Sequence, residues 1–254
     1  MQDDSRGAII SASLIDDSST TFLAFVLSMI AGNTDVISFL GLGGLFAAHI
    51  TGNLVVLATK LVVRDHTPLA QLIAVPVFVV VLAMTRVLAT ALDRIRVRPL
   101  TPLLLLQFLL LFAFLAVCVS TTQSVDPNTV RAIFASMLGV SAMAVQNALV
   151  RISLNRAPST AVMTTNVTLF TLDMVELLLR RRSSGASAAR DRARHTWPAI
   201  AGFLLGCTLG AATESAFGLR SLLMPAGLAL LALVLGVCFA QHNAGIHRSK
   251  TEPL

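Results

Sequence analysis

The stretch HITGNLVVLATK, from His49 to Lys60, decides the fold of this chain because it interrupts two apolar segments with polar and small residues. The apolar segment before it runs from Thr21 to Ala48, and the one after it runs from Leu54 to Val63. In a water-soluble core such an interruption is typical of a turn. In a strongly apolar chain the same residues suggest a second interpretation, which is a break in the backbone inside a membrane.

The composition indicates an integral membrane protein. Of the 254 residues, 55% are apolar and only 13% are charged, and the mean hydropathy is +0.80. A soluble domain carries about 25% charged residues, and a helix needs about 20 apolar residues to cross a bilayer. Apolar segments close to that length recur along the chain. The lipid bilayer is therefore the expected partner of this protein.

Eight apolar segments can be marked, and they predict a single transmembrane domain over residues 20–240. A polar tail of residues 1–19 precedes this domain, and a tail of residues 241–254 follows it. The second segment is too short to cross the hydrocarbon as a straight helix. The segments are Thr21–Ala48, Leu54–Val63, Leu69–Leu92, Leu103–Val119, Val130–Val150, Ala161–Leu179, Trp197–Ala212 and Leu222–Ala240.

The two halves of the chain share landmarks in the same order. Asn33 and Asn53 are twenty residues apart, as are Gln146 and Asn166, and the second pair follows the first at an offset of 113 residues. At this offset the triplet that ends in Asn53 falls on the triplet Thr164-Thr165-Asn166. Two prolines in the later segments match at offsets of 122 and 123. The pattern predicts an internal duplication, with one repeat over residues 20–119 and the other over residues 130–240.

Arginines between the segments indicate the topology, because Arg and Lys in short loops mark the cytoplasmic side of a membrane. Arg151 and Arg156 precede the sixth segment, and six arginines between Arg180 and Arg194 follow it. A full crossing cannot begin and end on the same side. The sixth segment is therefore predicted to enter the membrane, to break near Thr164–Asn166 and to return.

The second segment is predicted to do the same from the opposite side. The chain then has about six transmembrane helices and two short re-entrant elements, both termini are cytoplasmic, and the two repeats are inverted. This arrangement places Lys60 and Arg64 outside. Seven or eight full crossings are the alternative.

The triplet Thr51-Gly52-Asn53 can form a break because Gly52 permits a close turn and Asn53 can both donate and accept hydrogen bonds. A half-helix that starts there would direct unpaired N–H groups and the positive end of its dipole toward the centre of the membrane. An ordinary turn outside the membrane is the alternative. Phe46 and His49, just before the triplet, are candidates for a gate, although a histidine near the interface often simply contacts water.

Asp35 lies deep in the first apolar segment, beside Asn33 and Thr34. A carboxylate at that depth costs about 3 kcal/mol unless it is paired or reached by water, so Asp35 is a functional candidate. Arg86, inside the third segment, is its expected partner. Two interpretations stay open, a salt bridge that locks two helices together and a site for a solute or a proton.

Other residues have a structural interpretation beside the functional one. Gln146 and Asn147 either bond to neighbouring helices or line a cavity. Asp173 and Glu176 are expected to pair with the nearby arginines rather than to bind a metal. The glycines of the seventh segment recur every four residues and predict a close helix contact, either inside the monomer or at a homodimer face. They are Gly202, Gly206 and Gly210.

Several function classes are not expected. The chain has no HExxH, GxSxG, paired-cysteine or phosphate-loop motif, so neither an enzyme nor a bound metal or other cofactor is predicted. Its formal net charge of +6 comes from arginines in the loops, without an aromatic-interleaved basic surface, so nucleic acid is not an expected partner.

The same residues resemble the YoaK family, bacterial membrane proteins grouped as domain of unknown function 1275. The resemblance covers about residues 20–240 and implies an inner-membrane protein of about six spans, with no established substrate. The chain departs from the family pattern at His49, where asparagine is common, and at Thr165, where glycine often recurs. The resemblance rests on Gly32–Asp35, Phe46, Thr51–Asn53, Gln146–Asn147 and Met163–Asn166.

These expectations combine into an all-α polytopic membrane protein of transporter or channel type with one central polar site. Half-helix N-termini favour a small anionic or carboxylate solute, with Arg86 as counter-charge. The alternative is a non-transporting scaffold or accessory protein whose centre is packed shut. The residues expected along the solute or ion pathway are Asn33, Thr34, Asp35, Thr51, Gly52, Asn53, Arg86, Gln146, Asn147, Thr164, Thr165 and Asn166.

Overall fold

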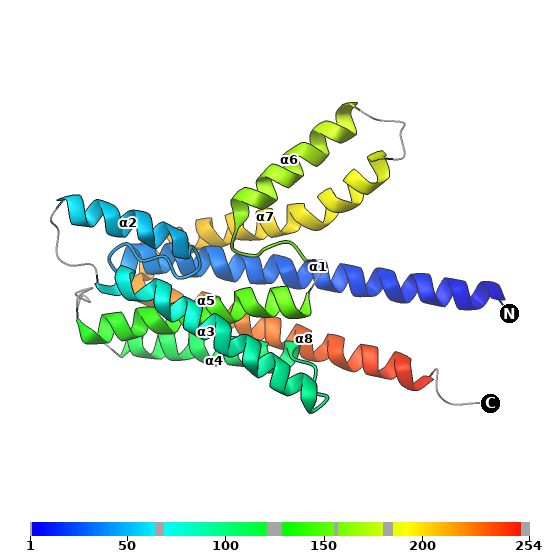
Figure 1. Cartoon of the computed structure of the whole chain (residues 1–254), viewed down its shortest axis with the longest axis horizontal. Helices are drawn as coiled ribbons and strands as arrows, with labels where there is room; N and C mark the ends of the chain where they lie inside the picture. Colours follow the sequence, from blue (N-terminus) through cyan, green and yellow to red (C-terminus); the bar gives the residue numbers. More distant parts are fainter. Residues whose placement is uncertain (1, 64–68, 121–128, 155–156, 180–184, 250–254) are drawn as a thin grey trace.

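A computed structural model describes residues 2–63, 69–120, 129–154, 157–179 and 185–249, and every regular element in these ranges is a helix. The expectation of an all-α protein is thus confirmed for the described part of the chain. Figure 1 shows the arrangement of the helices. They are α1 (Gln2–Gly41), α2 (Ile50–Val63), α3 (Leu69–Arg94), α4 (Leu100–Val119), α5 (Val130–Ser153), α6 (Met163–Leu179), α7 (Gly185–Phe217), the 3₁₀ turn η1 (Gly218–Leu222) and α8 (Leu223–Ser249).

The described residues include five segments that are long and apolar enough to cross a membrane, so the protein is membrane-embedded. The fifth segment passes through α7, η1 and α8, which are separate helices. By contrast, α2 has only 14 residues, or about 21 Å of helix, and cannot span about 30 Å of hydrocarbon. The five segments are Ser18–Gly41, Leu69–Arg94, Leu100–Val119, Val130–Ser153 and Ala186–Gln241.

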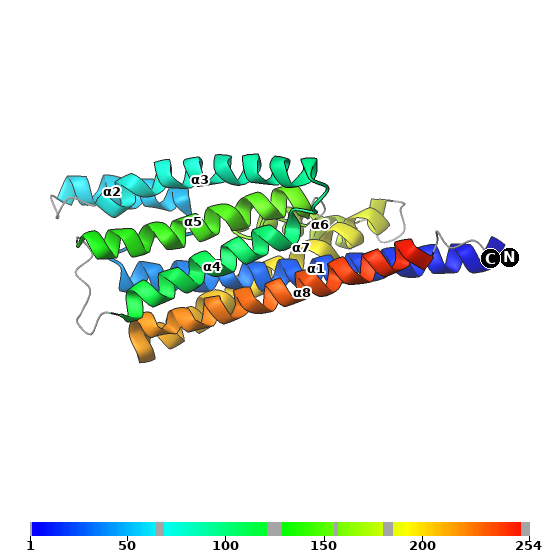
Figure 2. The ribbon, with the colours of Figure 1, turned by 90° about the horizontal axis from the view of Figure 1, so that it is seen from below.

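The helices α1 and α5 lie at the centre of the bundle. In their membrane-length windows 72% and 67% of the residues are buried, against 17% for α3. Helix α1 packs on α7 and α8, while α5 packs on α3 and α4, and α4 also contacts α8. Figures 1 and 2 show that α1 and α5 run in opposite directions and that both chain ends lie at the same end of the molecule.

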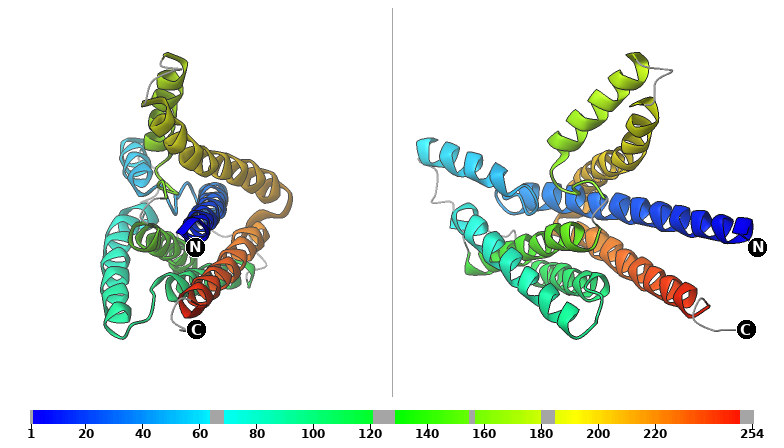
Figure 3. Two further views of the ribbon diagram at one scale, coloured as in Figure 1. Left: turned by 90° about the vertical axis from the view of Figure 1, so that its right-hand side faces the viewer. Right: turned by 45° about the vertical axis from the view of Figure 1, so that its right-hand side comes forward.

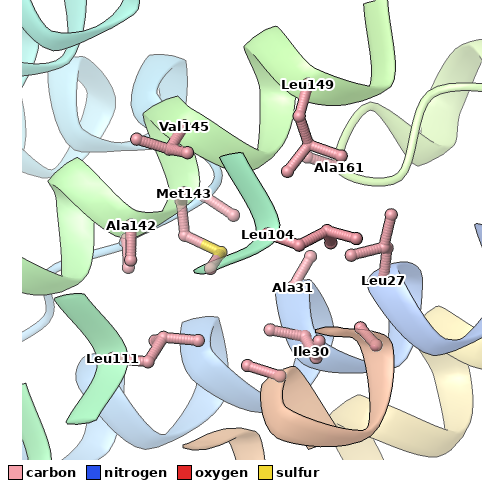
Figure 4. Close-up of a cluster of buried hydrophobic side chains, with 14 of the residues drawn as sticks. Leu27, Ile30, Ala31, Leu104, Leu111, Ala142, Met143, Val145, Leu149 and Ala161 are labelled. Atoms are coloured by element: carbon pink, nitrogen blue, oxygen red, sulfur yellow. The ribbon is translucent and has the colours of Figure 1, made fainter. Parts of the chain in front are cut away.

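The main hydrophobic cluster fills the space between α1, α4, α5 and α8. Figure 4 shows Leu27 and Ile30 of α1 against Leu104 and Leu111 of α4 and Met143 of α5. All five side chains are at most 1% exposed. Because lipid tails are as apolar as these side chains, their contribution to stability in a membrane comes mainly from close packing rather than from removal of water.

The first break in the backbone follows α1. Helix α1 ends at Gly41, and Gly43 and Gly44 adopt φ angles of 70° and 80°, which few residues other than glycine tolerate. The chain then turns back along α1, and α2 runs out toward the end of the molecule at which α1 finishes (Figure 1). The chain therefore reverses direction between α1 and α2.

The second break follows α5 and points the other way. Helix α5 ends at Ser153, and Pro158 lies in the following loop, where it cannot continue a helix. The chain turns back before α6 begins at Met163, and α6 runs toward the end at which α5 finishes (Figures 1 and 3). Both loops lie between the two ends of the bundle in these views.

The positions of the two breaks correct the sequence expectation. Residues 50–53 and 164–166 were expected to be the broken segments, but they form the first turns of α2 and α6. The described non-helical residues lie upstream, at 42–49, at 154 and at 157–162. Similarly, the polar residues from Gln2 to position 19 continue α1, and α8 extends through most of the expected C-terminal tail to Ser249.

Candidate functional site

Asn53 holds the first break together. Its side-chain oxygen accepts the backbone N–H of Phe46 at 2.8 Å, and its side-chain nitrogen donates to the Phe46 carbonyl at 2.7 Å. Asn53 is fully buried. Phe46 lies in a loop, so its backbone N–H and C=O have no partner within a helix, and the side chain of Asn53 supplies both hydrogen bonds. An unpaired backbone group in a buried position costs about 1–3 kcal/mol, and Asn53 avoids this cost.

Asn166 makes the corresponding contact in the second break. Its side-chain nitrogen donates to the carbonyl of Ser159 at 2.6 Å. In both breaks the acceptor lies seven residues before the asparagine, and Ser159 follows Phe46 at the same offset of 113 residues as Asn166 follows Asn53. The two asparagines thus have corresponding contacts, although within the described residues only Asn53 makes the reciprocal bond.

Asp35 contacts the first break loop rather than Arg86. Its carboxylate accepts the backbone N–H of Ala48 at 2.6 Å and pairs with Nδ1 of His49 at 2.5 Å. Only 3% of Asp35 is exposed. The expected Asp35–Arg86 salt bridge is absent from the described part of the chain, because the loop turns back far enough to bring a closer partner to the carboxylate.

Helices α1 and α7 pack closely around this pair, and this packing is called the closed contact below. The ring of His49 lies 5.5 Å from the ring of Phe203 of α7, measured between centroids. A Cβ placed on Gly206 would lie 2.2 Å from the carbonyl oxygen of Met29, and one on Gly202 would lie 2.4 Å from that of Phe25. The glycines of α7 therefore face α1 within the monomer, and this face is not free for a homodimer.

Asn33 and Thr34 lie in the same contact. The side-chain nitrogen of Asn33 donates to the Gly206 carbonyl at 3.3 Å, and the Thr34 hydroxyl donates to the Ile30 carbonyl within α1. The side-chain oxygen of Asn33 is buried and has no hydrogen-bond partner among the described residues. A buried oxygen without a hydrogen bond costs free energy, so the closed contact contains one unfavourable polar group.

Gln146 connects three elements. It accepts a hydrogen bond from Gln107 of α4 at 2.7 Å and donates to the Leu27 carbonyl of α1 and to the Thr160 hydroxyl in the second break loop. Gln146 is fully buried. These contacts favour the interpretation of Gln146 as a residue that holds helices together.

A cavity of about 820 Å³ lies between α3, α5 and the second break loop. Helix α3 lines it with residues at helical spacings of three and four, which share one face. The described residues around the cavity include two arginines but no aspartate or glutamate. They are Val79, Leu82, Ala83, Arg86, Asn147, Ala148, Val150, Arg151, Ile152, Leu154, Ala157, Ser159 and Thr160.

A family model described as a protein of unknown function, DUF1275, matches residues 23–235, which is most of the chain. The chain belongs to the DUF1275 family. No match was found among curated proteins or among solved structures. The matched region begins within α1 and ends within α8, so it contains both breaks and the cavity of this DUF1275 protein.

The expected central site of the DUF1275 chain is divided in the structure. Asn33, Asp35 and Asn53 lie in or beside the α1–α7 contact, whereas Arg86 and Asn147 line the cavity. The remaining expected residues do not line the cavity. Thr51, Thr164 and Thr165 are exposed, Gly52 packs on the Phe46 ring, and Asn166 is bonded to its own loop.

The sequence analysis did not identify several residues of the cavity and of the first break loop. Arg151, Ser159 and Thr160 line the cavity, and Lys60 and Gln71 both donate to the Gly43 carbonyl in the first break loop. Position 159 could have been found, because the repeat offset maps it onto Phe46. Lys60 could not, since its partner is a backbone carbonyl.

The acidic pair of α6 behaves as expected. Arg192 of α7 donates to Asp173 at 2.9 and 2.6 Å and to Glu176 at 3.4 Å. Asp173 and Glu176 therefore attach α6 to α7.

Proposed function

We propose that this DUF1275 protein is a small-solute transporter of the bacterial inner membrane, built from two inverted repeats. The first repeat contains α1–α4 and the second contains α5–α8, so each has three membrane-crossing helices and one half-length helix. Both termini are cytoplasmic, in keeping with the arginines at that end of the bundle. Inverted repeats with broken helices are a recurrent transporter architecture.

The packing of the helices supports the repeat. If each helix of the first repeat is exchanged with its counterpart in the second, the α1–α7 contact becomes the α5–α3 contact, and α1–α8 becomes α5–α4. The α2–α3 contact becomes α6–α7, and α4–α8 maps onto itself. The third helix of each repeat carries an internal proline, Pro76 in α3 and Pro198 in α7.

The transport proposal depends on a difference in packing between two contacts that the proposed repeat exchanges, α1–α7 and α3–α5. The α1–α7 contact is closed by glycines, whereas a partly open cavity lies beside the equivalent α3–α5 contact. A transporter that exposes its site alternately to the two sides needs one contact open and its counterpart closed in any one state. A scaffold protein, which needs only tight packing, gives no reason for such a cavity.

Thiol accessibility tests this proposal without knowledge of the solute. Cys207 of α7 lies in the closed contact, with its sulfur 3.1 Å from a Cβ placed on Gly32. In one variant Cys207 is the only cysteine, and in a second Ala83→Cys is the only cysteine and lies in the cavity. Each is reconstituted in vesicles and treated with a membrane-impermeant maleimide from either face.

A transporter predicts that Ala83→Cys reacts from the face with the arginine-rich loops and that Cys207 reacts, more slowly, from the opposite face. Cys118 of α4 is buried, and a variant that retains only Cys118 is the negative control. If Cys207 reacts no faster than Cys118 from both faces, the closed contact does not open and the scaffold function is correct.

A further inference from the structure

We infer that the cavity between α3 and α5 binds an amphipathic organic anion, whose charged group lies between Arg86 and Arg151 and whose apolar body extends along α3 toward Val79. This inference rests on the proposed transporter function and specifies its substrate class. The site differs from the central polar site expected from the sequence, because it excludes the α1–α7 residues and includes Arg151, Ser159 and Thr160.

The charge of the cavity determines the sign of the ligand. The cavity is lined by Arg86 of α3 and by Arg151 of α5, and no acidic side chain lines it among the described residues. Arg86 makes no ion pair in the described part of the chain. An arginine inside a membrane helix is costly unless it is paired or reached by water, so an anion that enters the cavity would offset this cost.

The polar groups near the arginines fit a carboxylate or a similar oxyanion. Asn147 lies one turn before Arg151 on α5, and its side-chain nitrogen donates to the Met143 carbonyl at 2.8 Å, so a second N–H remains for a ligand. The Ser159 and Thr160 side chains come from the break loop. Arginine and neutral donors together are the usual ligands of an oxyanion in a protein.

The remaining walls indicate an apolar body. Val79, Leu82 and Ala83 continue the Arg86 face of α3 away from the Arg94 end of that helix, toward the interior of the membrane. Val79 precedes Arg86 by seven residues, which is about 10 Å along a helix. A cavity of about 820 Å³ lies within the usual range for drug-sized ligands and exceeds the needs of an inorganic ion.

A set of three probes tests the chemistry. Binding of 4-phenylbutanoate, the neutral 4-phenylbutanamide and acetate is measured by isothermal titration calorimetry on the full chain in phosphatidylcholine nanodiscs. We expect only 4-phenylbutanoate to bind measurably, because the amide lacks the charge and acetate lacks the apolar body. Equal binding of the acid and its amide would overturn the inference.

Variants assign the binding to the cavity. Arg86→Gln should weaken 4-phenylbutanoate binding by about 10- to 100-fold, which corresponds to the loss of one charged hydrogen-bonding partner. Arg86→Lys should retain part of the affinity, because it keeps the charge without the planar fork. Arg94→Gln, two turns further along the same helix, is the matched control and should bind as wild type. An unchanged affinity of Arg86→Gln would show that Arg86 only extends toward the interface.

An anionic lipid could supply the same chemistry, and the lipid composition distinguishes the two sources. The titration is repeated in nanodiscs that contain phosphatidylglycerol. If this lipid competes with 4-phenylbutanoate in wild type, the native anion is a lipid; if it does not, the native anion is a soluble solute. If 4-phenylbutanoate binds but Cys207 is never labelled faster than Cys118, the anion site is retained and the transporter function is rejected. If Cys207 is labelled but no anion binds, the transporter function is retained and the anion site is rejected.

Discussion

The α1–α7 and α3–α5 contacts, which are equivalent under the proposed repeat, differ in how closely their helices pack. In the first, the backbones of α1 and α7 approach so closely that a Cβ on Gly206 would lie 2.2 Å from a carbonyl oxygen. In the second, α3 contains no glycine, and a cavity of about 820 Å³ is lined by residues of both α3 and α5. Small residues thus permit close helix approach in the first contact, and the second contact has larger side chains on α3.

The break loops beside the two contacts also differ, in the hydrogen bonds that hold each loop in place. The first loop is held by both hydrogen bonds of Asn53, by the Asp35–His49 pair and by Lys60. Among the described residues of the second loop, Asn166 donates one bond and Gln146 another. In the described residues the closed side therefore has more of these contacts, and substitutions there should have larger effects than the matched substitutions on the open side.

The largest effect is expected from Asn53→Ala. This change removes the side-chain partner of both the N–H and the carbonyl of the half-buried Phe46, at about 1 kcal/mol or more each. The matched variant Asn166→Ala removes one bond and should cost about half as much. Unfolding of both purified variants in a denaturant series measures the difference, and equal losses would show that the two loops are equally secured.

The second expected effect comes from Asp35→Asn. The substitution removes a charged acceptor from the Ala48 N–H and from His49, at about 1.5–3 kcal/mol. Because these bonds hold the closed side, the labelling rate of Cys207 should rise about tenfold or more, while that of Ala83→Cys stays the same. An equal rise at both thiols would mean general destabilisation instead of opening of one contact.

The sequence predicted the fold class because apolar length, which identifies the membrane helices, is a pattern that survives in one dimension. The repeat remains a prediction from the matching twenty-residue spacings of Asn33–Asn53 and Gln146–Asn166. The position of each break was wrong by several residues. A buried asparagine such as Asn53 satisfies backbone upstream of itself, so the conspicuous residue lies after the break and not in it.

The partner of Asp35 and the presence of the cavity could not be predicted from such patterns. Asp35 was matched with Arg86 by charge alone, but its actual partner, His49, depends on how far the loop turns back. The cavity depends on the distance between α3 and α5, which no spacing in the sequence reports. Charge and depth therefore identify which residues need partners, while the loop path and helix separation decide which partners they obtain.

A third prediction compares added volume on the two sides. Gly206→Ala places a methyl group against the Met29 carbonyl and should destabilise the protein by about 1–3 kcal/mol. Ala83→Leu adds more volume, but into the cavity, and should change the stability by less than about 0.5 kcal/mol. Thermal unfolding measures both. Gly227→Ala is the control for helix propensity, since a Cβ there meets nothing within 4 Å.

The smallest effect is expected from Lys60→Met. Lys60 donates to the Gly43 carbonyl at 2.7 Å, but Gln71 of α3 donates to the same oxygen at 3.0 Å. Because Gln71 keeps that oxygen satisfied, the single variant should lose about 1 kcal/mol or less in the denaturant series. The double variant with Gln71→Leu should lose more than the sum of the single losses, since only then is the carbonyl left without a donor. Additive losses would show that Lys60 does not help to close the first loop, and the stronger securing of the closed side would then depend on Asn53 and the Asp35–His49 pair.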